Sequence, residues 1–213
     1  MQLAPAIFVA DTLGLDFLNS IATLVDTPVD WIDDGDGLLH WLAQAKLVPA
    51  DALDELKRRA MPGELDKVAD QARALREWFR GFVRKHMGQP LTPKAVRELE
   101  PLNRLLERDE AFCRIVAHHY NDGDRLELQG MRRWRSPESL LLPIGEALGR
   151  FVCDENFSDV KACEGQGCTL MFAVLMLSQW RVIHLRAADL GDATGGDGAA
   201  LFARGTYAPR RKL

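Results

Sequence analysis

The 213-residue chain lacks a long apolar run and has only four cysteines. Its longest uninterrupted apolar segment, residues 170–177, is far shorter than the roughly 20 residues that a membrane-spanning helix needs. Residues 1–5 contain no base, so a secretory signal is not indicated either. Four cysteines are too few for a disulfide-based scaffold. We therefore expect a cytoplasmic protein with no membrane association, in which the cysteines are core thiols or metal ligands.

The chain also lacks the strong positive charge of a protein that coats nucleic acid, since its formal net charge is −4. The charge is unevenly distributed, however. Residues 1–56 contain ten acids and one base, whereas residues 161–213 contain seven bases and four acids. This asymmetry suggests an anionic partner for the basic end of the chain, although a solvated terminus that happens to be basic explains it equally well.

Helical periodicity dominates the first two-thirds of the chain. Its clearest stripe spans residues 65–86, where apolar residues recur every three or four positions and arginines such as Arg73, Arg76 and Arg80 lie between them. Gly88 stands where a helix of this extent would end. Five further helices are predicted, at residues 12–25, 38–45, 49–61, 93–106 and 137–152.

One segment has the character of a β-hairpin. Residues 113–120 are rich in β-branched and aromatic side chains, residues 121–123 read Asn-Asp-Gly, and residues 126–131 alternate in polarity. Cys113 and Cys153 lie in apolar periodic segments, so we expect both in the core. The Gly-, Ala- and Asp-rich residues 187–200 contain little that could build a core and are predicted to be loop or disordered.

Cys163 and Cys168 have the only spacing with clear chemical meaning. Two glycines lie among the four residues between them, which is typical of a turn that brings two thiolates to one tetrahedral metal. A closed structural zinc site needs four ligands, but no cysteine follows Cys168, and His184 is the only downstream histidine. The sequence therefore offers Cys163, Cys168 and His184 as zinc ligands. The alternative is a pair of free thiols on a turn.

Asp16 and Asn19 are polar residues in an otherwise apolar stretch of the first predicted helix. They can form bridges inside the bundle, or they can bind a small molecule, and the sequence leaves both interpretations open. The chain has no glycine-rich phosphate loop, nucleophile elbow or paired-histidine metal motif. We therefore expect no enzymatic activity.

Six motifs follow one another along the chain, namely GLDFLNS at 14–20, GLLHWL at 37–42, ARALR at 72–76, LNRLL at 102–106, PIGEA at 143–147 and VKACEGQGCTLMF at 160–172. In this order and spacing they resemble bacterial ABATE-domain proteins that carry a C-terminal CGNR zinc finger. The resemblance stops after Phe172. There the family would continue with an arginine-rich strand and a second cysteine pair, whereas this chain continues with an apolar segment and no cysteine.

The resemblance implies a stress-related transcription regulator of mainly α fold. Its parts would be a helical bundle-like regulatory domain with a small β-hairpin at residues 1–158, a degenerate zinc-ribbon-like remnant at 159–186 and a Gly/Ala-rich tail at 187–213. It also implies zinc at Cys163 and Cys168 and a C-terminal contact with DNA or RNA. The basic residues available for that contact are Arg181, Arg186, Arg210, Arg211 and Lys212. The alternative is a module that binds a small molecule through Asp16 and Asn19 and has no nucleic-acid role.

Overall fold

The structure is a computed structural model that describes residues 5–23, 28–120, 123–165 and 168–174. The chain divides into two compact units, Met1–Leu175 and Met176–Leu213. Every described residue belongs to the first unit. The stretch predicted to be loop or disordered, residues 187–200, lies outside the described residues.

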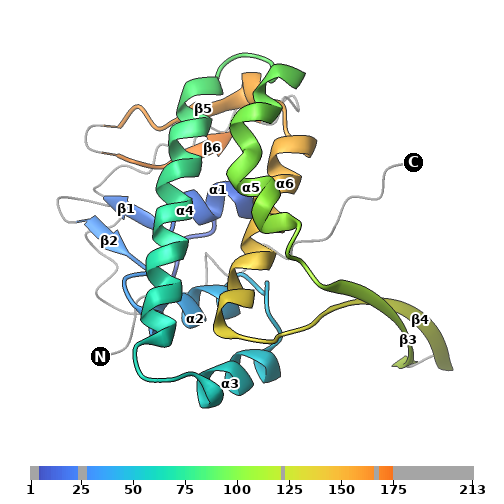
Figure 1. Ribbon diagram of the computed structural model, residues 1–213. Helices are drawn as coiled ribbons and strands as arrows, with labels where there is room; N and C mark the ends of the chain where they lie inside the picture. Colours follow the sequence, from blue (N-terminus) through green and yellow to red (C-terminus); the bar gives the residue numbers. More distant parts are fainter. Residues whose placement is uncertain (1–4, 24–27, 121–122, 166–167, 175–213) are drawn as a thin grey trace, which may run out of the picture. The chain divides into compact units, whose positions relative to one another are not determined.

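Helices make up most of the regular structure of the first unit (Figure 1). The α-helices are α1 Leu13–Leu18, α2 Gly35–Gln44, α3 Ala50–Arg59, α4 Glu64–His86, α5 Glu100–Leu106 and α6 Leu141–Asp154. Three short 3₁₀ segments accompany them, at Pro93–Leu99, Pro137–Leu140 and Phe157–Asp159. The mainly helical fold class is confirmed at this level. None of the helices in the described ranges is both long and apolar enough to cross a membrane.

The strands form three separate antiparallel pairs. They are β1 Ile21–Thr23 with β2 Pro28–Asp30, β3 Ala111–Tyr120 with β4 Gly123–Arg132, and β5 Val160–Ala162 with β6 Met171–Ala173. The hairpin predicted around residues 113–131 is confirmed. The zinc-ribbon-like character of the C-terminal segment stays a prediction, because only the β5–β6 part of it is described.

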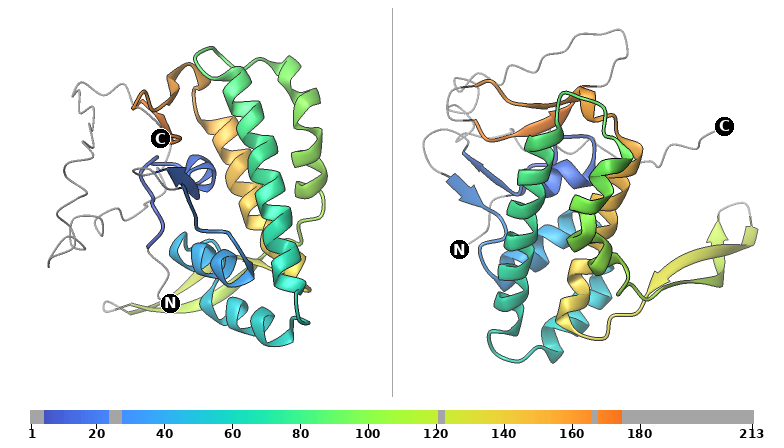
Figure 2. Two further views of the ribbon diagram at one scale, coloured as in Figure 1. Left: turned by 90° about the vertical axis from the view of Figure 1, so that its left-hand side faces the viewer. Right: turned by 45° about the horizontal axis from the view of Figure 1, so that its top comes forward.

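The core lies where α1, α4 and α6 meet. In Figures 1 and 2, α4, α5 and α6 run alongside one another, and the short α1 lies across them. An added Cβ at Gly14 would lie 2.5 Å from the Cβ of Phe151, so only glycine permits this approach of α1 to α6. An aromatic cluster fills the space between the helices, because Phe151 contacts Phe79 and Phe157, with ring centroids 6.0 and 5.2 Å apart.

The β3–β4 hairpin extends from the helical body as a ribbon (Figure 1 and the right view of Figure 2). Nine of the ten residues of β4 are exposed, so neither face of the ribbon is covered by the body. Its base is held by Arg132, whose guanidinium forms two hydrogen bonds with the Asp109 carboxylate, at 2.7 and 2.6 Å, and a third with Glu146 at 2.8 Å. We call β3–β4 the arm.

The first predicted helix is shorter than its apolar pattern suggested, because α1 ends at Leu18 rather than continuing to residue 25. Asn19 and Ser20 end the helix, and β1 begins at Ile21 and pairs with β2. Ser20 is held in place by the Arg76 guanidinium, which donates a hydrogen bond of 2.9 Å to its hydroxyl oxygen. A partner 56 positions away therefore overrides the local helical pattern.

Four side chains lie on the opposite side of the surface from the one expected. Cys113 and Cys153 are exposed, because the arm leaves the body and Cys153 lies on the outer side of α6. Arg76 and Arg80 are 2% and 5% exposed, although the pattern placed them between the apolar positions of α4. Both arginines are buried because β1, β2 and the end of α1 provide them with polar partners.

Candidate metal and nucleic-acid site

Cys163 and Cys168 lie on the turn between β5 and β6. The backbone N–H of Cys163 donates to the Leu170 carbonyl at 2.8 Å, and that of Cys168 donates to the Gly165 carbonyl at 3.0 Å. An added Cβ at Gly165 would lie 3.4 Å from both the Cys163 Sγ and the Cys168 Cβ, which places the two cysteines around this glycine. The predicted convergence of the cysteine pair is therefore present.

The turn also provides a donor for sulfur, since the Gly165 N–H points at the Cys163 Sγ at 3.4 Å. Such amide contacts stabilise a thiolate and are found around thiolate ligands of metals. Without a metal, partial burial and the neighbouring Cys163 side chain raise the pKa of the Cys168 thiol. The pair is therefore neutral at physiological pH until a cation binds and displaces the protons.

The two thiols form half of a tetrahedral zinc site. Within the described ranges, no group of three or more histidine, cysteine or acidic side chains could hold a metal ion. The third predicted ligand, His184, lies outside the described residues, as do the nucleic-acid contacts Arg181, Arg186, Arg210, Arg211 and Lys212. The zinc ligand set and the basic contacts thus stay predictions.

Asn19 anchors this hairpin to the helical body. Its Nδ2 donates to the Met171 carbonyl at 2.8 Å, and its Oδ1 accepts from the Met171 N–H at 2.9 Å. Asn19 is 0% exposed and Met171 is 1% exposed, so water cannot replace either bond. A second link is made by Thr169, whose hydroxyl oxygen accepts from the Thr23 N–H at 3.2 Å. The amide of Asn19 is thus used to pair the body with β6.

Asp16 binds the segment that precedes α1. Its Oδ1 accepts hydrogen bonds from the N–H groups of Val9 and Ala10 at 2.9 and 3.0 Å. Burial raises the pKa of Asp16 to about 6, although these two hydrogen bonds act in the opposite direction. These internal bonds of Asp16 and Asn19 support the bridging interpretation of the two residues. A small-molecule role for them stays a prediction.

A buried ion pair that sequence reasoning missed supports the same region. Arg76 forms two hydrogen bonds with the Asp30 carboxylate, at 2.8 and 2.6 Å, and its third contact is Ser20. Burial acts to raise the pKa of Asp30, but the bonds from Arg76 outweigh it and lower that pKa. The signal that could have revealed the pair is the position of Arg76, one helical turn after Ala72 and three residues before Phe79, on the buried side of α4.

Arg80 lies one turn further along α4. Its Nη2 donates to the Leu18 carbonyl, and its Nε lies 3.3 Å from a carboxylate oxygen of Glu77. Burial lowers the pKa of this guanidinium, while Glu77 acts to raise it. Arg76 and Arg80 together satisfy polar groups where α1 ends and β1 begins. The elements that carry Asn19, and through it the cysteine hairpin, are thereby fixed.

Comparison with known proteins identifies one family. The model of the ABATE family, described as "Putative stress-induced transcription regulator", matches residues 11–155, which is more than half of the chain. No curated protein and no solved structure matches. The matched region includes α1 to α6 and the arm, and it ends before the cysteine hairpin.

Proposed function

Because this chain belongs to the ABATE family of stress-induced transcription regulators, we propose that it regulates transcription through direct contact of its C-terminal segment with DNA or RNA. The matched residues 11–155 would form the regulatory body. The observation that carries the proposal is the cysteine turn of β5–β6, which is pre-shaped as half of a zinc site and attached to the body by Asn19. Non-enzymatic action agrees with the lack of a nucleophile–base motif in the sequence.

In this proposal the role of zinc is structural. Cys163 and Cys168 would provide two thiolates and His184 a third ligand, and bound zinc would supply the folding free energy that a segment of this size cannot obtain from a core. The chain's own arginines would then make the contact with phosphates, which carry one charge per nucleotide. Arg181, Arg186, Arg210, Arg211 and Lys212 are the proposed contacts.

The alternative is a module that binds a small molecule through Asp16 and Asn19. The structure provides no observation that favours it, since both side chains form hydrogen bonds with buried backbone groups. A ligand would have to compete with the bonds that attach Val9, Ala10 and Met171 to the body. We therefore favour the nucleic-acid proposal.

Zinc content of the purified full-length chain tests the metal part. We expect about one zinc per chain, lost in Cys163→Ser and retained in Cys153→Ser. The control removes a thiol that is exposed on α6 and remote from the β5–β6 turn. A chain that binds no zinc, or that loses it equally in both variants, would contradict the proposed ligand set.

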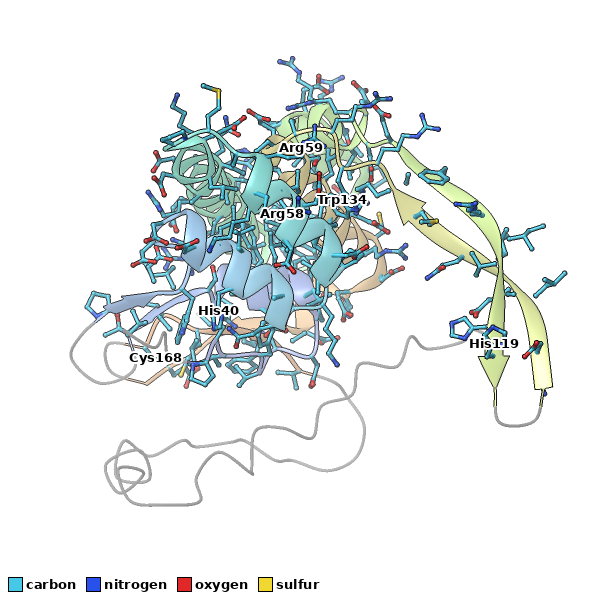
Figure 3. The ribbon with its side chains drawn as sticks, turned by 90° about the horizontal axis from the view of Figure 1, so that it is seen from below. His40, Arg58, Arg59, His119, Trp134 and Cys168 are labelled. Atoms are coloured by element: carbon cyan, nitrogen blue, oxygen red, sulfur yellow. The ribbon has the colours of Figure 1, made fainter. Side chains whose placement is uncertain are left out.

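Nucleic-acid binding is tested by titrating fluorescent DNA and RNA oligonucleotides at several salt concentrations. Arg210→Gln combined with Arg211→Gln should weaken binding and lower the salt dependence by about two phosphate contacts, at a slope of about 0.9 per contact on duplex DNA. The matched control changes Arg58 and Arg59, an exposed arginine pair on α3 labelled in Figure 3. Equal losses in both double variants, or no binding by the parent chain, would refute the proposal.

A further inference from the structure

The arm exposes an apolar face that a two-stranded ribbon cannot cover by itself. In its register, Ile115 lies opposite Leu128 and Ala117 lies opposite Leu126, and successive pairs alternate between the two faces. Ile115, Leu126 and Leu128 therefore share one face, and they are 67%, 78% and 67% exposed. An isolated two-stranded hairpin is marginally stable in water at best. The arm therefore needs a covering surface outside its own unit's body.

The charge of the arm argues against nucleic acid as its partner. Residues 111–132 contain three arginines and three acids, so the ribbon carries no net charge. Its histidines lie close to acids of the same arm, His119 at 2.6 Å from Asp124 and His118 at 3.8 Å from Glu127. A phosphate backbone is bound through an excess of positive charge. A neutral ribbon with an apolar face instead fits a protein surface.

The same unit offers an apolar surface at the foot of the arm. An open groove of about 1070 Å³ lies there, and the α2–α3 connection provides one wall of it with Leu47, Val48 and Pro49. Cys113 and Gly130, which are paired on the apolar face of the arm, also line the groove. The apolar face and the groove are thus continuous. Figure 3 shows the arm running away from the body, with His119 near its tip.

From this arrangement we infer that a second copy of the chain covers the arm, in a two-fold dimer whose arms pack apolar face against apolar face in antiparallel directions. Two-fold symmetry is the commonest form of soluble assembly, and it requires a self-complementary surface. In antiparallel packing the tip of each arm reaches the base of the other, where the groove lies. Each copy thereby provides both the inserted ribbon and the surface that receives it.

The available area supports contact with the groove as well as between the arms. A ten-residue strand is about 33 Å long and two paired strands are about 10 Å wide, so each arm has a footprint of roughly 330 Å². Two arms alone would bury roughly 700 Å², whereas stable interfaces bury about 1,200–2,000 Å². The groove walls of both copies must supply the remainder. A dimer of this kind therefore needs both regions.

The test is sedimentation equilibrium of the full chain over a micromolar concentration series, with a reducing agent because Cys113 and Cys153 are exposed. The parent chain should be a dimer. Leu126→Glu, which places a charge on the apolar face, should weaken the dimer by roughly 100-fold or more, as expected for an unpaired charge in a closed interface. Ala43→Glu, which lines the groove on exposed α2 surface, should also weaken it.

Arg114→Gln is the matched control, since it changes the net charge by the same amount but lies on the opposite face, across from Gln129. It should alter the dissociation constant by no more than about threefold, well under 1 kcal/mol. Helical circular dichroism should be the same in all variants, because the arm contains no helix. A monomeric parent chain, equal weakening by Arg114→Gln, or a loss of DNA or RNA binding confined to arm variants of a monomer would each overturn the inference.

Discussion

Replacing Asn19 with alanine should detach β6 from the helical body. The substitution removes two hydrogen bonds, of 2.8 and 2.9 Å, and leaves the N–H and the carbonyl of Met171 buried without those partners. Each buried hydrogen bond contributes about 1 kcal/mol, and an unsatisfied buried group costs about 1–3 kcal/mol, so the expected loss of stability is about 3 kcal/mol. For a chain of this size the melting temperature should fall by roughly 6–12 °C.

A matched control is available on the surface of the same unit. Asn156 also forms two hydrogen bonds, donating to an Asp159 oxygen at 2.9 Å and accepting from the Ser158 N–H at 3.1 Å, but its side chain is exposed. Water can replace both bonds, so Asn156→Ala should cost about 1 kcal/mol or less. Thermal unfolding followed by circular dichroism compares the two variants directly.

Thiol labelling gives a second, local measurement. Cys163 and Cys168 are partly buried on the β5–β6 turn, whereas Cys113 and Cys153 are exposed and should react fast in every variant. In Asn19→Ala the two slow thiols should react faster, because local opening of the hairpin costs less. If Asn19→Ala and Asn156→Ala lost the same stability and kept the same labelling rates, apolar contacts rather than the Asn19 amide would hold β6.

Two further predictions follow from buried charges. Arg76→Met should lower the free energy of unfolding by roughly 3–5 kcal/mol, because it leaves the Asp30 carboxylate without its guanidinium partner. Arg58→Met, at an exposed pair with Glu55, should cost less than about 1 kcal/mol, and equal shifts of the urea midpoint in the two variants would contradict the importance of burial. The pKa of Asp16 is raised from 3.8 to about 6, so the folded state binds this proton more tightly, and the contribution of Asp16 to stability decreases as the pH rises from about 4 to about 6. Asp16→Asn keeps an acceptor for Val9 and Ala10, and relative to the parent it should gain roughly 3 kcal/mol over that window and nothing above it; a pH-independent difference in urea midpoints would refute this.

Elements whose pattern is local could be predicted from the sequence. The apolar stripe of α4 and the alternation and turn residues of the arm specify these elements through neighbours three, four or two positions away. Pro49 marks the start of α3 and Thr12 caps α1 for the same reason. The cysteine turn belongs to this class too, since spacing and two glycines were enough to indicate that the two thiols converge.

Features that depend on partners far along the chain could not be predicted in this way. The early end of α1 depends on Arg76, and the role of Asn19 depends on Met171, which is 152 positions away. The pattern of α4 did not identify Arg76 and Arg80 as buried, because a guanidinium enters a core only where carboxylates and carbonyls from other elements meet it. Cys113 was expected in the core because its strand is apolar, yet the tertiary structure leaves both faces of the arm uncovered. Local sequence thus specifies which segments are helices and strands, whereas burial and polar pairing follow from which segments meet in three dimensions.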